Sequence, residues 1–577
     1  MKIAAATPQQ QQRHYCAGHP AQACTTLPRL LHAAANASAC RHSHAIAAGT
    51  VKSLAQAVFK LERCAPLALV TLILPLEHCM SSLIETLPSV AAFLTRSHAS
   101  FIDGEQRQPL NGHHRDLHNP ATGSVLSSTL QADAGQVEAI VQSAHRAFKS
   151  GVWTGLAPAE RERILLRFAD VVEAHGEELA QLETLNQGKS IHLARAVEVG
   201  ASLNYMRYMA GWATKIEGQT LDVSIPVPAG ARFNAYTRRE AVGVIAGIVP
   251  WNFPLMIALW KIMPALACGN TIIIKPADET PLTALRLAEL AIEAGIPAGV
   301  FNVLVGKGSQ AGSALVAHPL VSKVSFTGST AVGKQVGVAA LQNMTRFTLE
   351  LGGKNPMLVL ADADIDKAVA GAIGGGLLNQ GQVCAAASRL YVHASRYADF
   401  VEALSAQVAA LKVGAGMDAE AQINALVSRK QQDSVLNYLG IARQEGARFT
   451  TGGGQPDLPG YFVQPTVLAD VQQKMTATQE EIFGPVLSVL SFDDIDQAVA
   501  MANDSRYGLT ASIWSNDLGR VMDLIPRIEA GTLWVNNHVP VDPNMPFGGY
   551  KQSGIGREFG KAAIEGFTES KSVCITY

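Results

Sequence analysis

Cysteine is scarce over most of this chain. Only Cys268, Cys384 and Cys574 follow residue 80 in a sequence of 577 residues, whereas five cysteines precede it. So few thiols in so long a segment argue against a disulfide framework and favour a reducing compartment. We therefore expect a cytoplasmic protein.

Long apolar runs and a strong net charge are also absent. The best candidate for a membrane span, residues 65–76, has 12 residues and contains two prolines, whereas a span needs roughly 18–20 apolar residues. The formal net charge is −2, which gives no field to attract nucleic acid or an anionic membrane. We expect neither as a partner. The length allows two or three domains.

Acidic residues are missing from the first 60 residues, which carry scattered Lys and Arg. Such a composition is typical of a transit peptide. The early His and Cys residues, such as His14 and Cys16, could bind a metal, but their spacing matches no zinc pattern, and we expect no metal. From Met80 onward, the composition resembles that of the rest of the chain. We expect the native chain to start there, with residues 1–79 as an extension and a targeting segment as the alternative.

Apolar strands alternate with helices in the middle of the chain. Continuous apolar strands that alternate with helices predict a parallel sheet covered on both faces, which binds ligands at the carboxyl ends of its strands. The predicted strands are 242–249, 271–275, 300–305 and 321–326, and the predicted helices are 255–268, 282–294 and 310–317. A second α/β region follows residue 350, and residues 572–577 read as a terminal strand.

Cys384 and Glu350 are a candidate nucleophile and base, 34 residues apart and both beside glycine-containing turns. A thiol needs a low pKa or a nearby base to react near neutral pH. Taken singly, Cys384 could be an inert buried cysteine and Glu350 a helix cap or surface carboxylate. Beside a nucleotide-binding sheet, the pair indicates aldehyde oxidation.

Three further segments lie where predicted strands end. The Asn252 amide, held in Pro250-Trp251-Asn252-Phe253-Pro254, could donate to an oxyanion, although a turn-forming asparagine is the alternative. Lys275 ends a strand and could reach ribose hydroxyls. Gly328 and Ser329 open a helix and could hold a pyrophosphate, or Ser329 could serve only as a cap. We interpret Gly306-Lys307-Gly308 as a structural turn.

Several motifs, in order, resemble the NAD(P)-dependent aldehyde dehydrogenase superfamily over residues 85–577. They are Pro250-Trp251-Asn252-Phe253-Pro254, Lys275-Pro276-Ala277, Phe326-Thr327-Gly328-Ser329, Leu349-Glu350-Leu351-Gly352-Gly353-Lys354, Gln380-Gly381-Gln382-Val383-Cys384, Glu481-Ile482-Phe483-Gly484-Pro485 and Pro546-Phe547-Gly548-Gly549. Within the superfamily, Gln187-Gly188-Lys189-Ser190, residues 160–170 and residues 568–574 look most like the bacterial phenylacetaldehyde dehydrogenases.

The resemblance implies an α/β fold with a Rossmann-type parallel-sheet cofactor domain, an α/β catalytic domain and a small β oligomerisation arm. The implied cofactor domain covers 80–220 and 242–350, the arm 221–241 and 568–577, and the catalytic domain 351–567. The arm implies a homodimer or homotetramer.

The resemblance also implies a role for each matching residue. Cys384 would attack the aldehyde, Asn252 and the Cys384 N–H would hold the oxyanion, and Glu350 would activate water to hydrolyse the thioester. The implied cofactor contacts are Trp251, Lys275, Asp278, Gly328, Ser329, Glu481 and Phe483; the implied proton relay is Lys261 and Glu558; the implied substrate pocket is Phe253, Ile257, Trp260, Val383, Val541 and Phe547.

One position departs from the family pattern. Many NAD-preferring members carry Glu three residues after the ribose lysine, where this chain has Asp278, followed by Glu279. The shorter side chain weakens the expected grip on the ribose 2′-hydroxyl, so we expect NAD with NADP as a possibility. The expected substrate is an uncharged aryl or alkyl aldehyde, such as phenylacetaldehyde. A broad-specificity or betaine-type enzyme, a CoA-acylating variant, a thiol hydrolase and a non-catalytic structural protein are the alternatives.

Overall fold

The alternating strands and helices assemble around one large sheet in the structure, a computed structural model that describes residues 83–577. The expectations for residues 1–79 lie outside the described residues. The sheet has eight strands in the order β22-β12-β11-β8-β9-β10-β2-β3. Their bounds are β2 (Ser100–Ile102), β3 (Glu105–Arg107), β8 (Val244–Ile248), β9 (Thr271–Lys275), β10 (Phe301–Val303), β11 (Val321–Thr327), β12 (Arg346–Glu350) and β22 (Gly554–Ile555).

The five central strands, from β12 to β10, run parallel. The four strands predicted to form a parallel sheet do so, and β22, β2 and β3 extend this sheet at its edges as antiparallel neighbours. The hairpin of β2 and β3 needs only a tight turn at Asp103 and Gly104, both with positive φ, whereas parallel neighbours need long crossovers.

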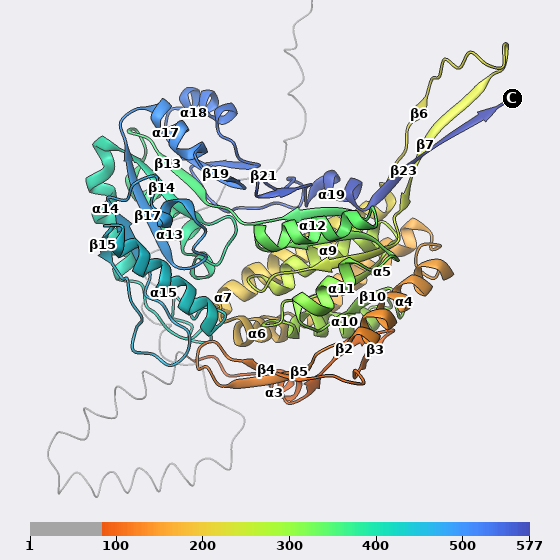
Figure 1. Ribbon diagram of the computed structural model, residues 1–577, viewed down its shortest axis with the longest axis horizontal. Helices are drawn as coiled ribbons and strands as arrows, with labels where there is room; N and C mark the ends of the chain where they lie inside the picture. The colour runs from red at the N-terminus through yellow and green to blue at the C-terminus, as the bar shows by residue number, and fades with distance from the viewer. Residues whose placement is uncertain (1–82) are drawn as a thin grey trace, which may run out of the picture. The chain divides into compact units, whose positions relative to one another are not determined.

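Helices cover both faces of this sheet, because successive side chains of a strand point to opposite faces. In β9, Ile272 and Ile274 pack in one buried cluster and Ile273 in another. The first cluster includes helices α5 (Pro158–Ala174), α8 (Ser202–Ala210), α9 (Pro254–Ala267) and α10 (Leu282–Glu293). The second includes α4 (Ala134–Ser150), α11 (Ser313–Val316) and α12 (Thr330–Gln342). Figure 1 labels these helices on the ribbon.

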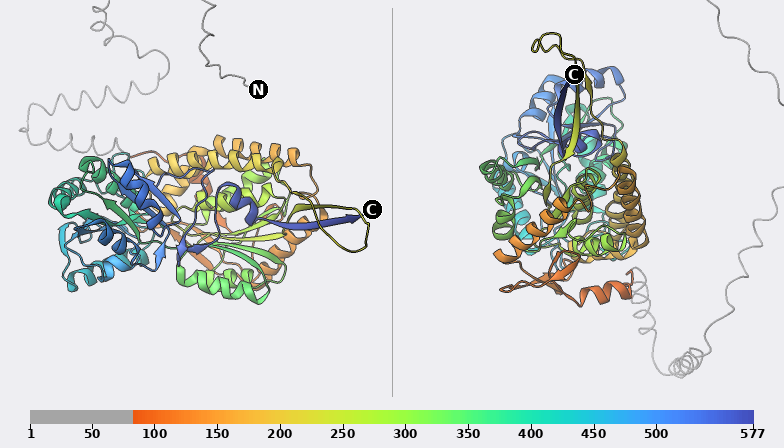
Figure 2. Two further views of the ribbon diagram at one scale, coloured as in Figure 1. Left: turned by 90° about the horizontal axis from the view of Figure 1, so that it is seen from above. Right: turned by 90° about the vertical axis from the view of Figure 1, so that its right-hand side faces the viewer.

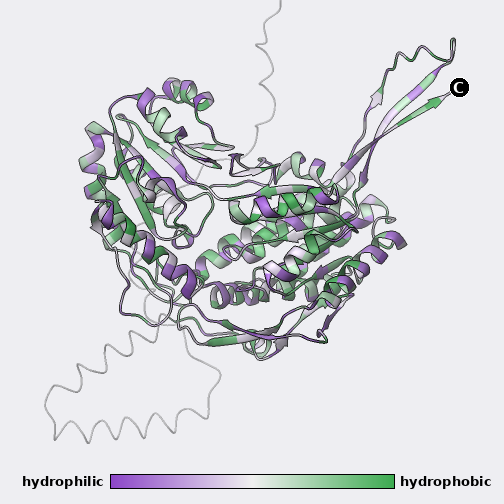
Figure 3. Cartoon of the chain, in the orientation of Figure 1, coloured by the Kyte–Doolittle hydropathy of each residue, from purple (hydrophilic) through white to green (hydrophobic). Residues whose placement is uncertain are grey.

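A second sheet of seven strands follows, in the order β15-β16-β17-β14-β13-β19-β20. Its strands are β13 (Asn355–Val359), β14 (Ala387–His393), β15 (Arg448–Thr451), β16 (Thr466–Ala469), β17 (Val486–Phe492), β19 (Thr510–Trp514) and β20 (Thr532–Val535). Its two faces are covered by α13 (Ile365–Gly376) with α14 (Ala394–Ala409), and by α15 (Arg429–Gln444) with α17 (Ile495–Asn503) and α18 (Leu518–Leu524). Hydrophilic residues gather on outward faces of the helices (Figure 3).

A third sheet forms an extended arm. The long strands β7 (Phe233–Ala241) and β23 (Thr568–Thr576) pair antiparallel, and the short β6 (Thr220–Leu221) pairs with β7. Figure 2 shows the arm reaching beyond the helices of the main body. Apolar side chains on it are exposed, including Val227 and Ile575. Near the start of the described chain, α3 (Pro88–Leu94) precedes the small sheet β1-β5-β4, whose strands are Ser97–His98, Val125–Leu130 and His114–His118.

Most predicted elements agree with the structure within a few residues, and the strand 271–275 matches β9 fully. The helix expected over 310–317 needs correction. This segment begins with a π-helical turn, Gly308–Gly312, and only the short α11 that follows is α-helical. The predicted domain boundaries remain a prediction, and β22 lies in the first sheet although it falls within residues 351–567. Among residues 83–577, no helix combines the length and the apolar character that a bilayer span needs.

Candidate active site

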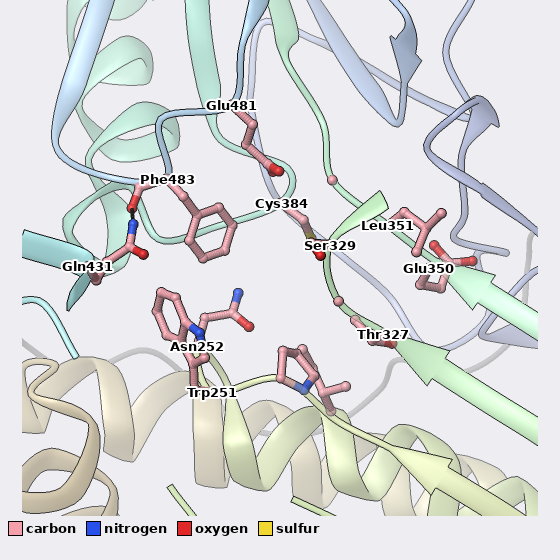
Figure 4. Close-up of a pocket in the computed structure, with 14 residues that line it drawn as sticks. Trp251, Asn252, Thr327, Ser329, Glu350, Leu351, Cys384, Gln431, Glu481 and Phe483 are labelled. Carbon is pink, nitrogen blue, oxygen red and sulfur yellow. Dashed lines mark hydrogen bonds between the residues drawn. The ribbon is translucent and has the colours of Figure 1, made fainter. Parts of the chain in front are cut away.

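Loops from both large sheets meet around a cavity of about 260 Å³. Three of them follow the carboxyl ends of β8, β11 and β12, as expected for a parallel sheet, and the others precede β14 and β17. The lining residues are Pro250, Trp251, Asn252, Ile257, Thr327, Gly328, Ser329, Glu350, Leu351, Gly352, Cys384, Gln431, Glu481 and Phe483. Figure 4 shows the Cys384 thiol and the Asn252 amide directed toward the same space.

The loop that carries Cys384 has an unusual backbone. Asn379, Gln380 and Gly381 take φ values of 49°, 57° and 70° in succession, and such left-handed residues other than glycine cost of order 1–3 kcal/mol each. The Asn355 amide holds the far side of the loop, because its Nδ2 donates to the carbonyls of Cys384 at 2.8 Å and Ala386 at 2.9 Å. The loop is thus held in a conformation that an isolated chain would rarely adopt.

The Cys384 thiol is neutral in this arrangement. Burial raises its pKa to about 12, with further contributions from the nearby Glu481 and Glu350 carboxyls, whereas the backbone N–H groups of Ala385 and Cys384 lower it. The thiol therefore needs a base, or a positive charge brought into the cavity, before it can act as a nucleophile.

Glu350 is the last residue of β12 and is buried. Burial, followed by the charge of Glu558, raises its pKa well above the usual glutamate value. Its Oε1 has no hydrogen-bond partner among the described residues. A carboxyl without a partner beside a cavity is suited to accept a proton from a water or thiol there.

Asn252 lies in the turn between β8 and α9. Its Nδ2 donates to the carbonyl of Gln382 at 2.9 Å, which uses one of its two N–H bonds and orients the other. Its own backbone carbonyl accepts from Lys189 Nζ at 2.8 Å and from Asn379 Nδ2 at 2.9 Å. The turn and the nucleophile loop are therefore joined directly, which fixes the amide relative to Cys384.

Lys189 belongs to a buried ionic cluster under that turn. Its Nζ pairs with Glu198, lies 3.9 Å from Glu183 and sits 4.4 Å from the centre of the Phe253 ring. The two carboxyls also accept from the first backbone N–H groups of α9, those of Leu255 and Met256. Burial raises the pKa of Glu183 to about 8, so one carboxyl keeps a proton near neutral pH.

Lys261 and Glu558 lie together behind the cavity. Lys261 Nζ is fully buried and donates to Glu558 at 2.7 Å, to Thr327 Oγ1 at 2.8 Å and to Ser325 Oγ at 3.1 Å. Thr327 also lines the cavity. These groups form a hydrogen-bonded path from the cavity into the interior, between α9 and the loop before α19 (Gly560–Gly566).

The predicted cofactor contacts fall into two groups. Trp251, Gly328, Ser329, Glu481 and Phe483 line the cavity. The Trp251 and Phe483 rings meet edge to face at 5.2 Å, and Glu481 accepts from the Gly353 N–H at 3.0 Å. Ser329 also caps α12, because its Oγ accepts from the Val332 N–H.

Lys275 and Asp278 do not line this cavity but lie at the carboxyl end of β9, in the same sheet. Lys275 Nζ donates to Asp278 Oδ1 at 2.6 Å. The π-helical turn at Gly308–Gly312 passes beside this lysine, because a Cβ on Gly308 would stand 3.9 Å from its Nζ. Gly308, interpreted as part of a structural turn, thus lies next to the predicted ribose site.

Five of the six predicted pocket residues lie elsewhere than the cavity wall. Phe253, Trp260 and Phe547 are buried in the main core cluster, and Val541 is exposed. Of the others, Ile257 lines the cavity, and Val383 is buried in the core next to Cys384. Sequence reasoning missed Gln431, Leu351, Gly352 and Asn379. Gln431 lies on α15, far away in sequence, and gave no local signal, whereas Gly352 stood within a quoted motif.

Comparison with known proteins decides the family. The model of the aldehyde dehydrogenase family matches residues 108–573. The chain belongs to the aldehyde dehydrogenase family. It is 49% identical over 494 residues to the phenylacetaldehyde dehydrogenase of Pseudomonas fluorescens, covering 85% of this chain and 98% of that one. It is 43% identical over 459 residues to the human mitochondrial aldehyde dehydrogenase, covering 79% and 88%.

A solved structure agrees with this assignment. The aldehyde dehydrogenase of Bacillus cereus, in its NAD+ complex, superposes with a TM-score of 0.83 at 44% identity, covering 85% of this chain and 99% of that one. The predicted α/β aldehyde dehydrogenase-like fold is confirmed. The protein is an NAD(P)-dependent oxidoreductase that oxidises aldehydes to acids. Among the described residues, no group of three or more His, Cys, Asp or Glu side chains could hold a metal ion.

Replacing Lys189 with methionine tests the ionic cluster. The substitution leaves the Glu198 carboxylate buried without its cation, which typically costs about 3–5 kcal/mol. We expect the Lys189→Met enzyme to lose that much free energy of unfolding in urea titrations followed by circular dichroism. Lys367→Met is the control, because Lys367 is 76% exposed and exposed ion pairs contribute about 0–1 kcal/mol. Equal losses in the two variants would show that the cluster does not stabilise the fold.

Proposed function

We propose that the protein oxidises phenylacetaldehyde, or a similar uncharged aryl or alkyl aldehyde, to the carboxylic acid with NAD+. The observation that carries the proposal is the convergence of a thiol, a partnerless buried carboxyl and an amide, from Cys384, Glu350 and Asn252, on one cavity. The likeness to the Pseudomonas enzyme supports the substrate class.

The chemistry follows from these three groups. The Cys384 thiolate adds to the aldehyde carbonyl to form a thiohemiacetal, and the Asn252 amide with the Cys384 N–H stabilises the oxyanion. Loss of a hydride then leaves a thioester on Cys384. Glu350 takes a proton from water, and the resulting attack on the thioester releases the acid. The path through Lys261 and Glu558 carries the proton away.

The residues around the cavity fit a nicotinamide dinucleotide. When bound, this cofactor accepts the hydride. Gly328 and Ser329, at the start of α12, would hold the pyrophosphate with helix N–H groups, Lys275 and Asp278 the adenosine ribose, and Glu481 the nicotinamide ribose. Trp251 and Phe483 would confine the nicotinamide end.

The cavity wall favours an uncharged substrate. Trp251, Ile257, Leu351 and Phe483 supply apolar surface, and no Lys or Arg is among the lining residues. An aldehyde that carries its own carboxylate would therefore find no cation to pair with in this cavity. A betaine-type substrate is the second candidate, because carboxyls and aromatic rings can receive a quaternary ammonium group.

An aldehyde panel tests the proposal. We expect NADH formation with kcat/KM highest for phenylacetaldehyde, lower for acetaldehyde and lowest for succinate semialdehyde, because the cavity has apolar walls and no cation. The measurement is absorbance at the NADH band with purified protein, with betaine aldehyde included. Preference for betaine aldehyde would select the second candidate. Dependence on free CoA would indicate an acylating enzyme, and ester hydrolysis without NADH a thiol hydrolase.

The pH dependence tests Glu350. A general base acts only when it is deprotonated, so a raised pKa moves the onset of activity to higher pH. We therefore expect kcat to rise with pH along a limb whose midpoint lies well above the ordinary glutamate pKa. Glu350→Gln should lower kcat by about 10²–10⁴-fold and remove this limb. Glu565→Gln, which changes an exposed carboxyl near the arm, is the control. It should keep both the wild-type kcat and the pH limb. A limb that persists in Glu350→Gln would assign the base elsewhere.

The arm suggests self-association. We infer a homodimer or homotetramer, because the arm exposes apolar side chains, including Val227 and Ile575, that a partner subunit would cover. Light scattering should give two or four times the subunit mass for the full chain. Deletion of residues 568–577, which removes β23, should shift the population toward smaller species. A monomeric full chain at micromolar concentration would contradict the inference.

A further inference from the structure

Arg115 reaches the predicted ribose site from a distant part of the chain. It lies on β4, and its guanidinium contacts the two acidic residues that follow β9. Its Nη2 donates to Glu279 Oε1 at 3.2 Å, and its Nη1 lies 3.6 Å from Asp278 Oδ2. No segment of the first sheet supplies this arginine, so the motif around Lys275 gives no hint of it.

The Asp278 carboxylate therefore stands between two cations. Lys275 Nζ approaches one oxygen at 2.6 Å and Arg115 faces the other. An acidic side chain at this place selects NAD by accepting a hydrogen bond from the ribose 2′-hydroxyl and by repelling a 2′-phosphate. Two neighbouring cations offset the negative charge of Asp278, and both its oxygens are directed toward them. The repulsion of a phosphate is reduced accordingly.

Arg115 is also free to change partners. Its side chain is 37% exposed and that of Glu279 is 34% exposed, and ion pairs this accessible to water contribute only about 0–1 kcal/mol. A phosphate dianion offers the planar guanidinium a bidentate, charge-assisted contact. A cavity of about 350 Å³ borders Arg115 and Glu279 and includes the basic residues Arg429 and Lys430. The Arg115 guanidinium thus has open space on the side of Glu279, Arg429 and Lys430, and Lys275 and Asp278 lie outside this lining.

We propose that Arg115 is a specificity-determining residue that lets this enzyme bind NADP+ as well as NAD+. It exchanges its contacts with Asp278 and Glu279 for the 2′-phosphate, which it holds together with Lys275. The proposal rests on the proposed function in one respect, namely that Lys275 holds the adenosine ribose.

Binding of nucleotide fragments tests this without catalysis. The probes are 2′,5′-ADP, which carries the 2′-phosphate, and 5′-AMP, which lacks it, titrated into the full chain by isothermal calorimetry. Arg115→Ala should weaken binding of 2′,5′-ADP by about tenfold or more, as expected for one charge-assisted contact, and change binding of 5′-AMP less than about threefold. Arg115→Lys keeps the charge without the planar fork and should lie between the two.

Arg107→Ala is the matched control. Arg107 is an arginine of similar exposure, 44%, on β3, the strand that precedes β4 in the chain, and pairs with Asp103 and Glu105. The Arg107→Ala substitution should leave the affinities for 2′,5′-ADP and for 5′-AMP unchanged. Steady-state assays with phenylacetaldehyde should show the same selectivity, with kcat/KM for NADP+ falling in Arg115→Ala and kcat/KM for NAD+ retained.

Three results would overturn the proposal. The first is wild-type protein that binds 5′-AMP but not 2′,5′-ADP, and the second is an equal loss of both ligands in Arg115→Ala. The third is 2′,5′-ADP binding that Arg115→Ala leaves unchanged. Failure of the proposed function would look different. In that case the wild-type protein would bind none of the four ligands 5′-AMP, 2′,5′-ADP, NAD+ and NADP+.

Discussion

The backbone carbonyl of Asn252 is the point on which the site depends. It accepts from Lys189 Nζ at 2.8 Å and from Asn379 Nδ2 at 2.9 Å, so it ties the β8–α9 turn to a buried cation on one side and to the nucleophile loop on the other. A buried carbonyl must find donors, and here the donors come from segments far apart in the chain. The same contacts that satisfy it hold the amide beside Cys384 and keep the left-handed residues before Cys384 in place.

Burial gives the site its chemistry and also limits it. It raises the pKa of Cys384 to about 12 and that of Glu350 well above the ordinary value, so both groups carry protons in the same enclosed space. Turnover therefore requires protons to leave the cavity. The contact between Thr327, which lines the cavity, and the buried pair of Lys261 and Glu558 provides hydrogen-bonded groups for this. The residues behind the cavity are thus as much a part of the proposed mechanism as those that line it.

The sequence predicts well what depends on local pattern. Apolar runs such as 271–275 give buried strands, because both faces of a parallel sheet are covered. Motif residues that follow the central strands lie together, because those strands end at one edge. Contacts across the chain could not be predicted: Arg115 meets Asp278 from another sheet, and Gln431 reaches the cavity from α15. The helix expected over 310–317 begins with a π-turn, whose glycines lie beside the Lys275 side chain.

The central claim is that Cys384 carries the substrate as a thioester that Glu350 helps to hydrolyse. The most direct measurement is peptide mass spectrometry of Glu350→Gln protein, quenched in acid shortly after mixing with phenylacetaldehyde and NAD+. The account predicts a phenylacetyl adduct on the peptide that contains Cys384, in an amount matching the NADH formed in the first turnover. First-turnover NADH without an adduct on Cys384, or with the adduct on another residue, would contradict it.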